Sequence, residues 1–179
     1  MEEIHPILID NIYKKTEKNP RIRHAVRGII INDNNEVALV HIKGDDVFGK
    51  RDHFELPGGG IEKGEDEIKA LKREIAEEIG FEIKDIKEVG IIANEYNVLK
   101  RIDVQHFYLA KTSKFIGQSL LDYEKGLFNE VIFYPLDKVL AMYKKMTVEN
   151  VGILIHNRDS IAIKKAIEII EKEAFKKLD

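Results

Sequence analysis

The feature that most constrains this chain is a glycine-rich turn that leads into an amphipathic helix. Pro57-Gly58-Gly59-Gly60 ends a short apolar stretch, 54–56, and a turn of this composition marks backbone that must stay free of side chains. Over the following residues, 65–79, apolar side chains recur at spacings of three, four and four: Ile68, Leu71, Ile75 and Ile79. Acidic residues begin this segment and Gly80 follows it, so we predict a helix over 65–79.

The rest of the chain alternates between strand-like and helix-like segments. Runs rich in Ile and Val predict strands at 7–13, 24–31, 36–42, 87–93, 102–110 and 131–134. The turn signal Asn32-Asp33-Asn34-Asn35 predicts that the second and third of these form a hairpin. Helical patterns follow at 136–146 and 158–178. This order predicts an α/β fold, with helices packed against a mostly antiparallel or mixed sheet.

Composition bounds the functions that such a fold can carry. The 179 residues suit a single domain over 1–179, with 1–20 as an N-terminal extension, and a net charge of −3 gives no general attraction to nucleic acid or membranes. The absence of cysteine excludes disulfides, thiolate metal sites and cysteine nucleophiles. The acidic start lacks the pattern of a signal peptide, and no apolar run is long enough to span a membrane. We therefore expect a cytoplasmic protein.

The predicted helix carries three carboxylates on one face. Because residues on a helix advance by about 100° each, Glu74, Glu77 and Glu78 project together, beside the apolar stripe. Like charges at this spacing repel, and a divalent cation such as Mg²⁺ supplies the missing counter-charge. The carbonyl of Gly58 offers a further ligand, and Arg73 can brace the glutamates. These residues predict metal-assisted phosphate chemistry.

The same segment resembles a known motif. The order of its fixed positions is Gly59, five residues, Glu65, seven residues, Arg73-Glu74-Ile75, one residue, Glu77-Glu78, one residue, Gly80-Phe81. It resembles the Nudix box with every constrained position filled. The resemblance implies a Nudix-type α/β/α sandwich with a mixed central sheet. It also implies a hydrolase that cleaves a nucleoside diphosphate linked to another moiety, by attack of water on phosphorus, with Mg²⁺ or Mn²⁺ as cofactor.

The resemblance also assigns roles. Glu74, Glu77 and Glu78 match the metal-binding and base-providing glutamates, the carbonyl of Gly58 matches a backbone ligand, and Arg73 matches a residue that orients a glutamate. Members of this family take the general base either from the box or from a later loop. Here the candidates are Glu74 in the box and Glu124 or Glu130 in the loop before the strand at 131–134, of which we favour Glu124. The predicted catalytic set is therefore Arg73, Glu74, Glu77 and Glu124.

Substrate contacts are expected from residues near the box. An arginine can hold a phosphate and an aromatic ring can stack on a base, which makes Phe48, Arg51 and His53 candidates. The resemblance adds Tyr96, fifteen residues after Phe81, close to where some family members carry a tyrosine or proline that goes with their substrate class.

The sequence leaves the substrate open among nucleoside triphosphates, ADP-ribose, dinucleoside polyphosphates and, as the one nucleic acid, capped RNA. An isomerase of the same fold would need a catalytic cysteine, which this chain lacks. A nucleotide-sensing protein without turnover stays as the alternative, and a homodimer using the strand at 7–13 is a further expectation.

Overall fold

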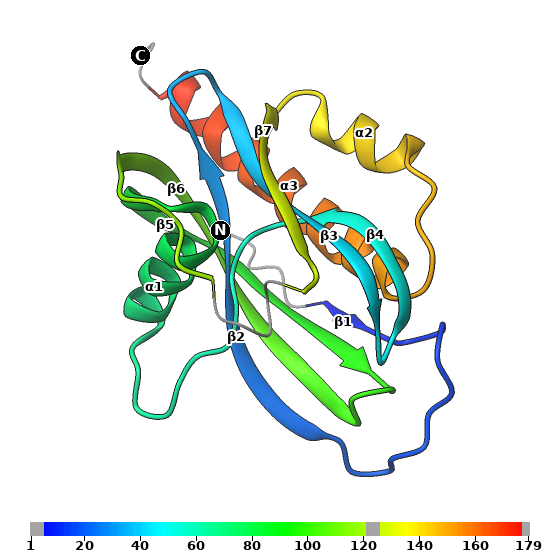
Figure 1. Ribbon diagram of the computed structural model, residues 1–179. Helices are drawn as coiled ribbons and strands as arrows, with labels where there is room; N and C mark the ends of the chain where they lie inside the picture. Colours follow the sequence, from blue (N-terminus) through cyan, green and yellow to red (C-terminus); the bar gives the residue numbers. More distant parts are fainter. Residues whose placement is uncertain (1–5, 121–125, 177–179) are drawn as a thin grey trace.

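The computed structural model describes residues 6–120 and 126–176. Within them the chain forms seven strands and three helices (Figure 1). The strands are β1 (Ile7–Leu8), β2 (Arg21–Ile31), β3 (Glu36–Asp46), β4 (Gly49–Glu55), β5 (Phe81–Tyr96), β6 (Arg101–Phe115) and β7 (Phe128–Pro135). The helices are α1 (Glu67–Ile79), α2 (Val139–Lys145) and α3 (Val151–Phe175).

The strands join in one mixed sheet between helices. Their order is β1-β5-β6-β2-β3-β4, with β7 paired to β3. The pairs β1–β5 and β2–β6 are parallel, and the other pairs are antiparallel. Helix α1 covers one face of the sheet, and α3 with α2 covers the other (Figure 1). The predicted α/β/α sandwich with a mixed central sheet is therefore confirmed.

Alternating side chains of the central strands fill both cores. On β2, Ile29 and Ile31 pack toward α2 and α3, whereas Val26 and Ile30 pack toward α1. Successive side chains of a strand point to opposite faces, so a strand covered on both sides reads as an unbroken apolar run. This explains the stretches of Ile and Val in the sequence.

Helix α1 is bounded as its sequence signals predict. The side chain of Asp66 accepts hydrogen bonds from the backbone N–H groups of Ile68 and Lys69, so the helix begins at Glu67, two residues later than predicted. Gly80 ends it with a φ of 75°, a left-handed conformation that favours glycine. The helix therefore starts and stops at residues that fix where its glutamates lie.

The predicted hairpin between β2 and β3 is wrong beyond its turn. The two strands pair with each other only at Ile31 and Val37. In contrast, β2 pairs along its whole length with β6. The other edge of β2 is taken by the glycine-rich turn, because the N–H groups of Val26 and Gly28 donate to the carbonyls of Gly59 and Pro57, at 2.9 Å each. A loop lying along a strand in this way requires residues without bulk, which explains the glycine run.

The N-terminal strand is shorter than predicted. Only Ile7–Leu8 form β1, which pairs with β5 of the same chain. The strand stops because the carboxylate of Asp10 accepts hydrogen bonds from the backbone N–H groups of Ile12 and Tyr13 and so turns the chain. The same carboxylate accepts from the N–H of Asn97 at 2.8 Å, which fastens this segment to the β5–β6 turn.

The C-terminal helix begins earlier than predicted. Helix α3 starts at Val151 instead of residue 158 and ends at Phe175. Arg158 and Asp159, where the predicted helix starts, lie inside the observed helix, where their side chains are buried and paired with each other. Among the described residues, no helix is long and apolar enough to cross a membrane.

Candidate active site

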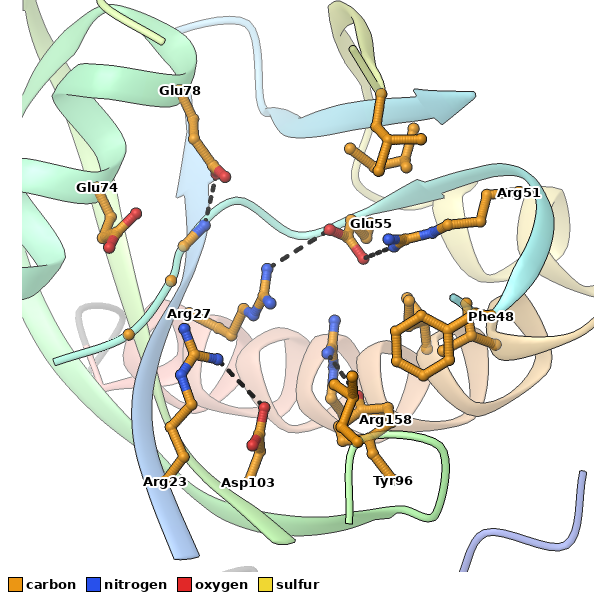
Figure 2. A pocket seen from close by; sticks show the side chains of 18 of the residues that line it. Arg23, Arg27, Phe48, Arg51, Glu55, Glu74, Glu78, Tyr96, Asp103 and Arg158 are labelled. Atoms are coloured by element: carbon orange, nitrogen blue, oxygen red, sulfur yellow. Dashed lines mark hydrogen bonds and ion pairs between the residues drawn. The ribbon is translucent and has the colours of Figure 1, made fainter. Parts of the chain in front are cut away.

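A pocket of about 310 Å³ opens where the glycine-rich turn meets the β3–β4 hairpin, the β5–β6 turn and the start of α3 (Figure 2). Carboxylates from α1 lie at one end of it, and the rings of Phe48 and Tyr96 lie at the other. Five arginine side chains also line the pocket: Arg23, Arg27, Arg51, Arg101 and Arg158. Figure 2 shows Arg27 and Arg158 between the two ends. The pocket thus has an acidic end, a basic middle and an aromatic end.

Glu74 and Glu78 form the acidic end. A carboxylate oxygen of Glu78 accepts a hydrogen bond of 2.7 Å from the N–H of Gly58. Burial raises the pKa of Glu78 to about 8, against the opposing effects of Arg27 and this hydrogen bond, and burial also raises the pKa of Glu74. Two carboxylates, one buried and one partly buried, whose charged forms are disfavoured make a site that gains from a bound cation.

Arg73 ties the helix to the glycine-rich turn. Its guanidinium donates to the carboxylate of Glu65 at 2.8 and 2.9 Å, to Glu74 at 2.8 Å, and to the carbonyl of Gly60 at 3.1 Å. The carboxylate of Glu77 lies 3.3 Å from the same guanidinium. Arg73 therefore fixes the orientation of Glu74 and holds Glu77 outside the pocket lining.

The turn itself passes close to these carboxylates. A Cβ atom placed on Gly59 would lie 2.4 to 2.6 Å from the carboxylate atoms of Glu74, so any larger residue here would displace that carboxylate. Across residues 6–120 and 126–176, no three acidic or histidine side chains gather closely enough to hold a metal ion unaided. A cation here would complete its shell with a backbone carbonyl and with water or substrate oxygens, which is the usual situation for Mg²⁺.

The basic middle of the pocket is ordered by Glu55. Its carboxylate lies 3.7 Å from Arg27 and 3.8 Å from Arg51. Burial alone would raise the pKa of Glu55, but the hydrogen bond with His53 and the charges of both arginines hold it well below its usual range. The ionised carboxylate fixes two long side chains that can then bind anionic oxygens without further loss of freedom.

Of the four substrate-binding residues predicted from the sequence, three line the pocket and one does not. The three that line it are Phe48, Arg51 and Tyr96. His53 is only 1% exposed and lies behind the lining, 3.5 Å from Glu55 and edge-on to the ring of His156. Its position is that of a packed histidine that supports Glu55.

Of the two late candidates for the general base, the structure describes only Glu130. Glu124 lies outside the described residues. Glu130 is on β7, where its side chain is 54% exposed and lies 3.4 Å from His41, away from the pocket lining. Of the candidate bases in the described part of the chain, Glu74 is the one that lines the pocket.

Several pocket residues were not predicted from the sequence; a period of two is a weak signal for those on strands, and Arg158 on α3 has no such signal. Polar side chains alternate along β2, β4 and β6, and the alternate positions of each strand share one face. The missed residues are Arg23 and Arg27 on β2, Glu55 on β4, Arg101 and Asp103 on β6, and Arg158 on α3.

Comparison with known families agrees with this geometry. A family model for the NUDIX domain matches residues 21–157. The chain belongs to the Nudix hydrolase family. The predicted identification as a Nudix pyrophosphohydrolase is thereby confirmed, and Nudix enzymes generally use divalent metals.

Individual relatives are distant. This Nudix chain is 28% identical over 137 residues to the methanol dehydrogenase activator of Bacillus methanolicus, covering 75% of this chain and 71% of that protein. It is 32% identical over 96 residues to a Bacillus subtilis protein named for 8-oxo-dGTP diphosphatase activity, covering 52% of this chain and 56% of the relative. A crystal structure titled as an ADP compounds hydrolase superposes with a TM-score of 0.63 at 17% identity, covering 88% of this chain and 77% of that one. This structural similarity, at such low sequence identity, is evidence for the shared fold alone.

Proposed function

We propose that this Nudix protein hydrolyses the diphosphate linkage of a nucleoside diphosphate derivative, with Mg²⁺ or Mn²⁺ as cofactor. The observation that carries the proposal is one pocket that is lined both by the carboxylates of Glu74 and Glu78 and by five arginines. Carboxylates suit a hard divalent cation, and arginines suit phosphate oxygens. A diphosphate is the chemical group that needs both.

The residues that would hold the cation are Glu74 and Glu78, with the carbonyl of Gly58 and, after release from Arg73, the carboxylate of Glu77. When bound, the cation would lower the pKa of a water molecule and neutralise charge on the phosphate oxygens. The pKa of Glu78, raised to about 8 by burial, and the crowding of Glu74 against Gly59 support this donor set.

The chain's own residues would position and deprotonate water. Glu74 is 7% exposed and accepts from Arg73 at 2.8 Å, so its carboxylate is held in one orientation. Burial raises its pKa, which brings a carboxylate nearer to the range in which it can take a proton at neutral pH. We propose Glu74 as a ligand and general base, and Glu124 as the late carboxylate that would share this role.

The rest of the substrate would lie along the arginines toward the aromatic end. Arg51 is held by Asp46 at 3.1 Å and its guanidinium lies 5.8 Å from the ring centre of Phe48. Arg27 donates to the carbonyl of Leu56 at 3.0 Å. These arginines would bind phosphate oxygens, and Tyr96 would contact the nucleoside.

The compounds to be tested as substrates share one chemical group, the diphosphate linkage. The names of the B. subtilis relative and of the superposed hydrolase refer to a nucleoside triphosphate and to ADP compounds, and both classes contain a diphosphate. Dinucleoside polyphosphates and capped RNA contain one too. A cytoplasmic location and a homodimer stay as predictions.

The test is release of nucleotide from each member of that panel, followed by chromatography, with Mg²⁺, with Mn²⁺ and with a chelator. Cleavage that requires the metal and yields a nucleoside monophosphate or the equivalent phosphate product is the expected result. Equilibrium binding measured on the same compounds identifies the alternative. Tight binding with no cleavage of any compound would contradict the proposal and favour a nucleotide-sensing protein.

A further inference from the structure

Arg158 is a buried arginine, and one nitrogen of its guanidinium group has no hydrogen-bond partner among the described residues. Its side chain is 1% exposed. Its Nε donates to Asp159 at 2.7 Å, and its Nη1 donates to Gln105 at 3.1 Å and lies 3.4 Å from the hydroxyl of Tyr96. Among the described residues, its Nη2 has no hydrogen-bond partner. Figure 2 shows that this end of the guanidinium points into the pocket.

The charge of Arg158 is already balanced. Asp159 is 0% exposed and accepts from both Arg158 and the backbone N–H of Leu56, at 2.7 and 2.8 Å. A ligand group that meets Nη2 therefore has no need to be an anion. It does need acceptor atoms, because a buried N–H group left without a partner is costly.

The surroundings of Nη2 suit a flat apolar ring. The rings of Phe48 and Tyr96 lie 6.0 Å apart at 66°, and Val151 and Ile155 of α3 pack with them in one apolar cluster. Tyr96 connects this cluster to Arg158 through its hydroxyl group. At this end of the pocket an aromatic wall therefore adjoins two N–H donors in a fixed place.

We propose that Arg158 is a specificity-determining residue that selects a 6-oxopurine base by donating from Nη2 to the base edge. The inference rests on the proposed function, since it places the base at the end of the pocket remote from Glu78. A guanine-type base offers Nη2 two adjacent acceptors, O6 and N7, on one edge. Adenine instead turns its N6 amino group, a donor, toward the guanidinium.

The first test uses the unaltered protein and measures equilibrium binding of nucleoside monophosphates without metal. GMP and IMP share O6 and N7, so we expect them to bind within about threefold of each other. AMP lacks O6 and 7-deaza-GMP lacks N7, so each should bind about tenfold more weakly than GMP. Equal binding of GMP and AMP would overturn the proposal.

The second test compares Arg158→Lys with Arg21→Lys. Lysine keeps a positive charge beside Asp159 but has a single nitrogen, which cannot bind Asp159 and Gln105 and also donate to the base, so the preference for GMP over AMP should fall by about tenfold. Arg21 is an exposed residue of β2 outside the pocket lining, and its variant should keep the wild-type preference. An unchanged preference in Arg158→Lys would overturn the assignment.

Binding also separates this inference from the proposed hydrolysis. A GMP preference that is lost in Arg158→Lys, in a protein that cleaves no diphosphate, would refute the hydrolase proposal and leave Arg158 as the residue that reads the base. Metal-dependent cleavage with equal use of guanine and adenine substrates would refute the role of Arg158 alone.

Discussion

Arg73 holds the carboxylate of Glu65 through two hydrogen bonds, of 2.9 Å from Nε and 2.8 Å from Nη2. Glu65 lies in the loop before α1, and Arg73 lies on the helix two turns later. The same guanidinium donates to Glu74. The pair thus connects the fold of the loop to the orientation of a carboxylate in the pocket.

This pair predicts a pH-dependent stability. The hydrogen bonds from Arg73 lower the pKa of Glu65 from 4.5 to about 2, so the pair stabilises the folded state fully above pH 4.5 and loses this contribution as the pH falls toward 2. Because the site is partly open to water, we expect Glu65→Gln to lower the free energy of unfolding by about 1 kcal/mol at pH 6. The difference from wild type should shrink by more than half at about pH 3.

Urea unfolding of both proteins at the two pH values measures this. Glu171→Gln, an exposed site on α3, is the matched control and should show no pH-dependent difference. A destabilisation by Glu65→Gln that is equally large at the acidic pH would mean that shape, and not charge, makes the contribution.

Alanine at the two neighbouring glycines should separate stability from activity. Gly58 has a φ of 138°, and a Cβ there would lie 2.2 Å from the carbonyl oxygen of Val26, which is backbone and cannot move away cheaply. We expect Gly58→Ala to lower the free energy of unfolding by about 3 kcal/mol. At Gly59 the Cβ meets the side chain of Glu74, which can shift, so Gly59→Ala should cost about 1 kcal/mol or less but reduce kcat by about 100-fold.

Thermal or chemical unfolding and steady-state kinetics of the two variants test this contrast. Full activity in Gly59→Ala would show that the position of Glu74 is not critical. A Gly58→Ala protein as stable as wild type would show that the glycine-rich turn can move away from β2 without lowering the free energy of unfolding.

The N-terminal segment should act on substrate binding. The hydroxyl of Tyr13 donates to the carbonyl of Phe48 at 2.6 Å, and the two rings lie 5.8 Å apart. Tyr13→Phe keeps the ring but removes the hydrogen bond to the carbonyl of Phe48, so Phe48 is held less firmly in the pocket. Because Tyr13 acts by positioning Phe48, we expect KM to rise by about threefold to tenfold with kcat unchanged. Tyr134→Phe removes a hydroxyl from β7, outside the pocket lining, and serves as the control.

Steady-state kinetics on the best substrate of the panel decides between outcomes. A fall in kcat at unchanged KM would place the effect of Tyr13 on the reacting end instead of the aromatic end. Equal effects of the two variants would remove the link between Tyr13 and the pocket.

Local signals in the sequence were enough to predict the helix of the box and each of the described strands except β4. Asp66 and Gly80 act within one turn of α1, so their effects are visible in a short window of sequence. The partners of β2 were not visible, because its pairing with β6 joins residues about 80 positions apart. The first turns of α3, residues 151–157, were also missed: Val151, Leu154 and Ile155 are buried there only because the chain folds them against Phe48 and Tyr96.

The acidic end of the site was predictable, and the basic middle was not. Glu74 and Glu78 are fixed by helical spacing within one motif, whereas Arg27, Glu55 and Arg158 come from three elements that meet only in the folded chain. Each of these side chains, taken alone, resembles ordinary surface charge. Their role depends on burial, which the sequence does not display.

The central claim is that Glu78 belongs to the site of metal-dependent hydrolysis. The most direct measurement is the rate of nucleotide release with saturating Mg²⁺ for wild type, Glu78→Gln and Glu171→Gln, with circular dichroism and unfolding to verify the fold of each. We predict a loss of about 100-fold or more in Glu78→Gln with the fold intact, and wild-type turnover in Glu171→Gln. Near-normal turnover by folded Glu78→Gln would contradict the account.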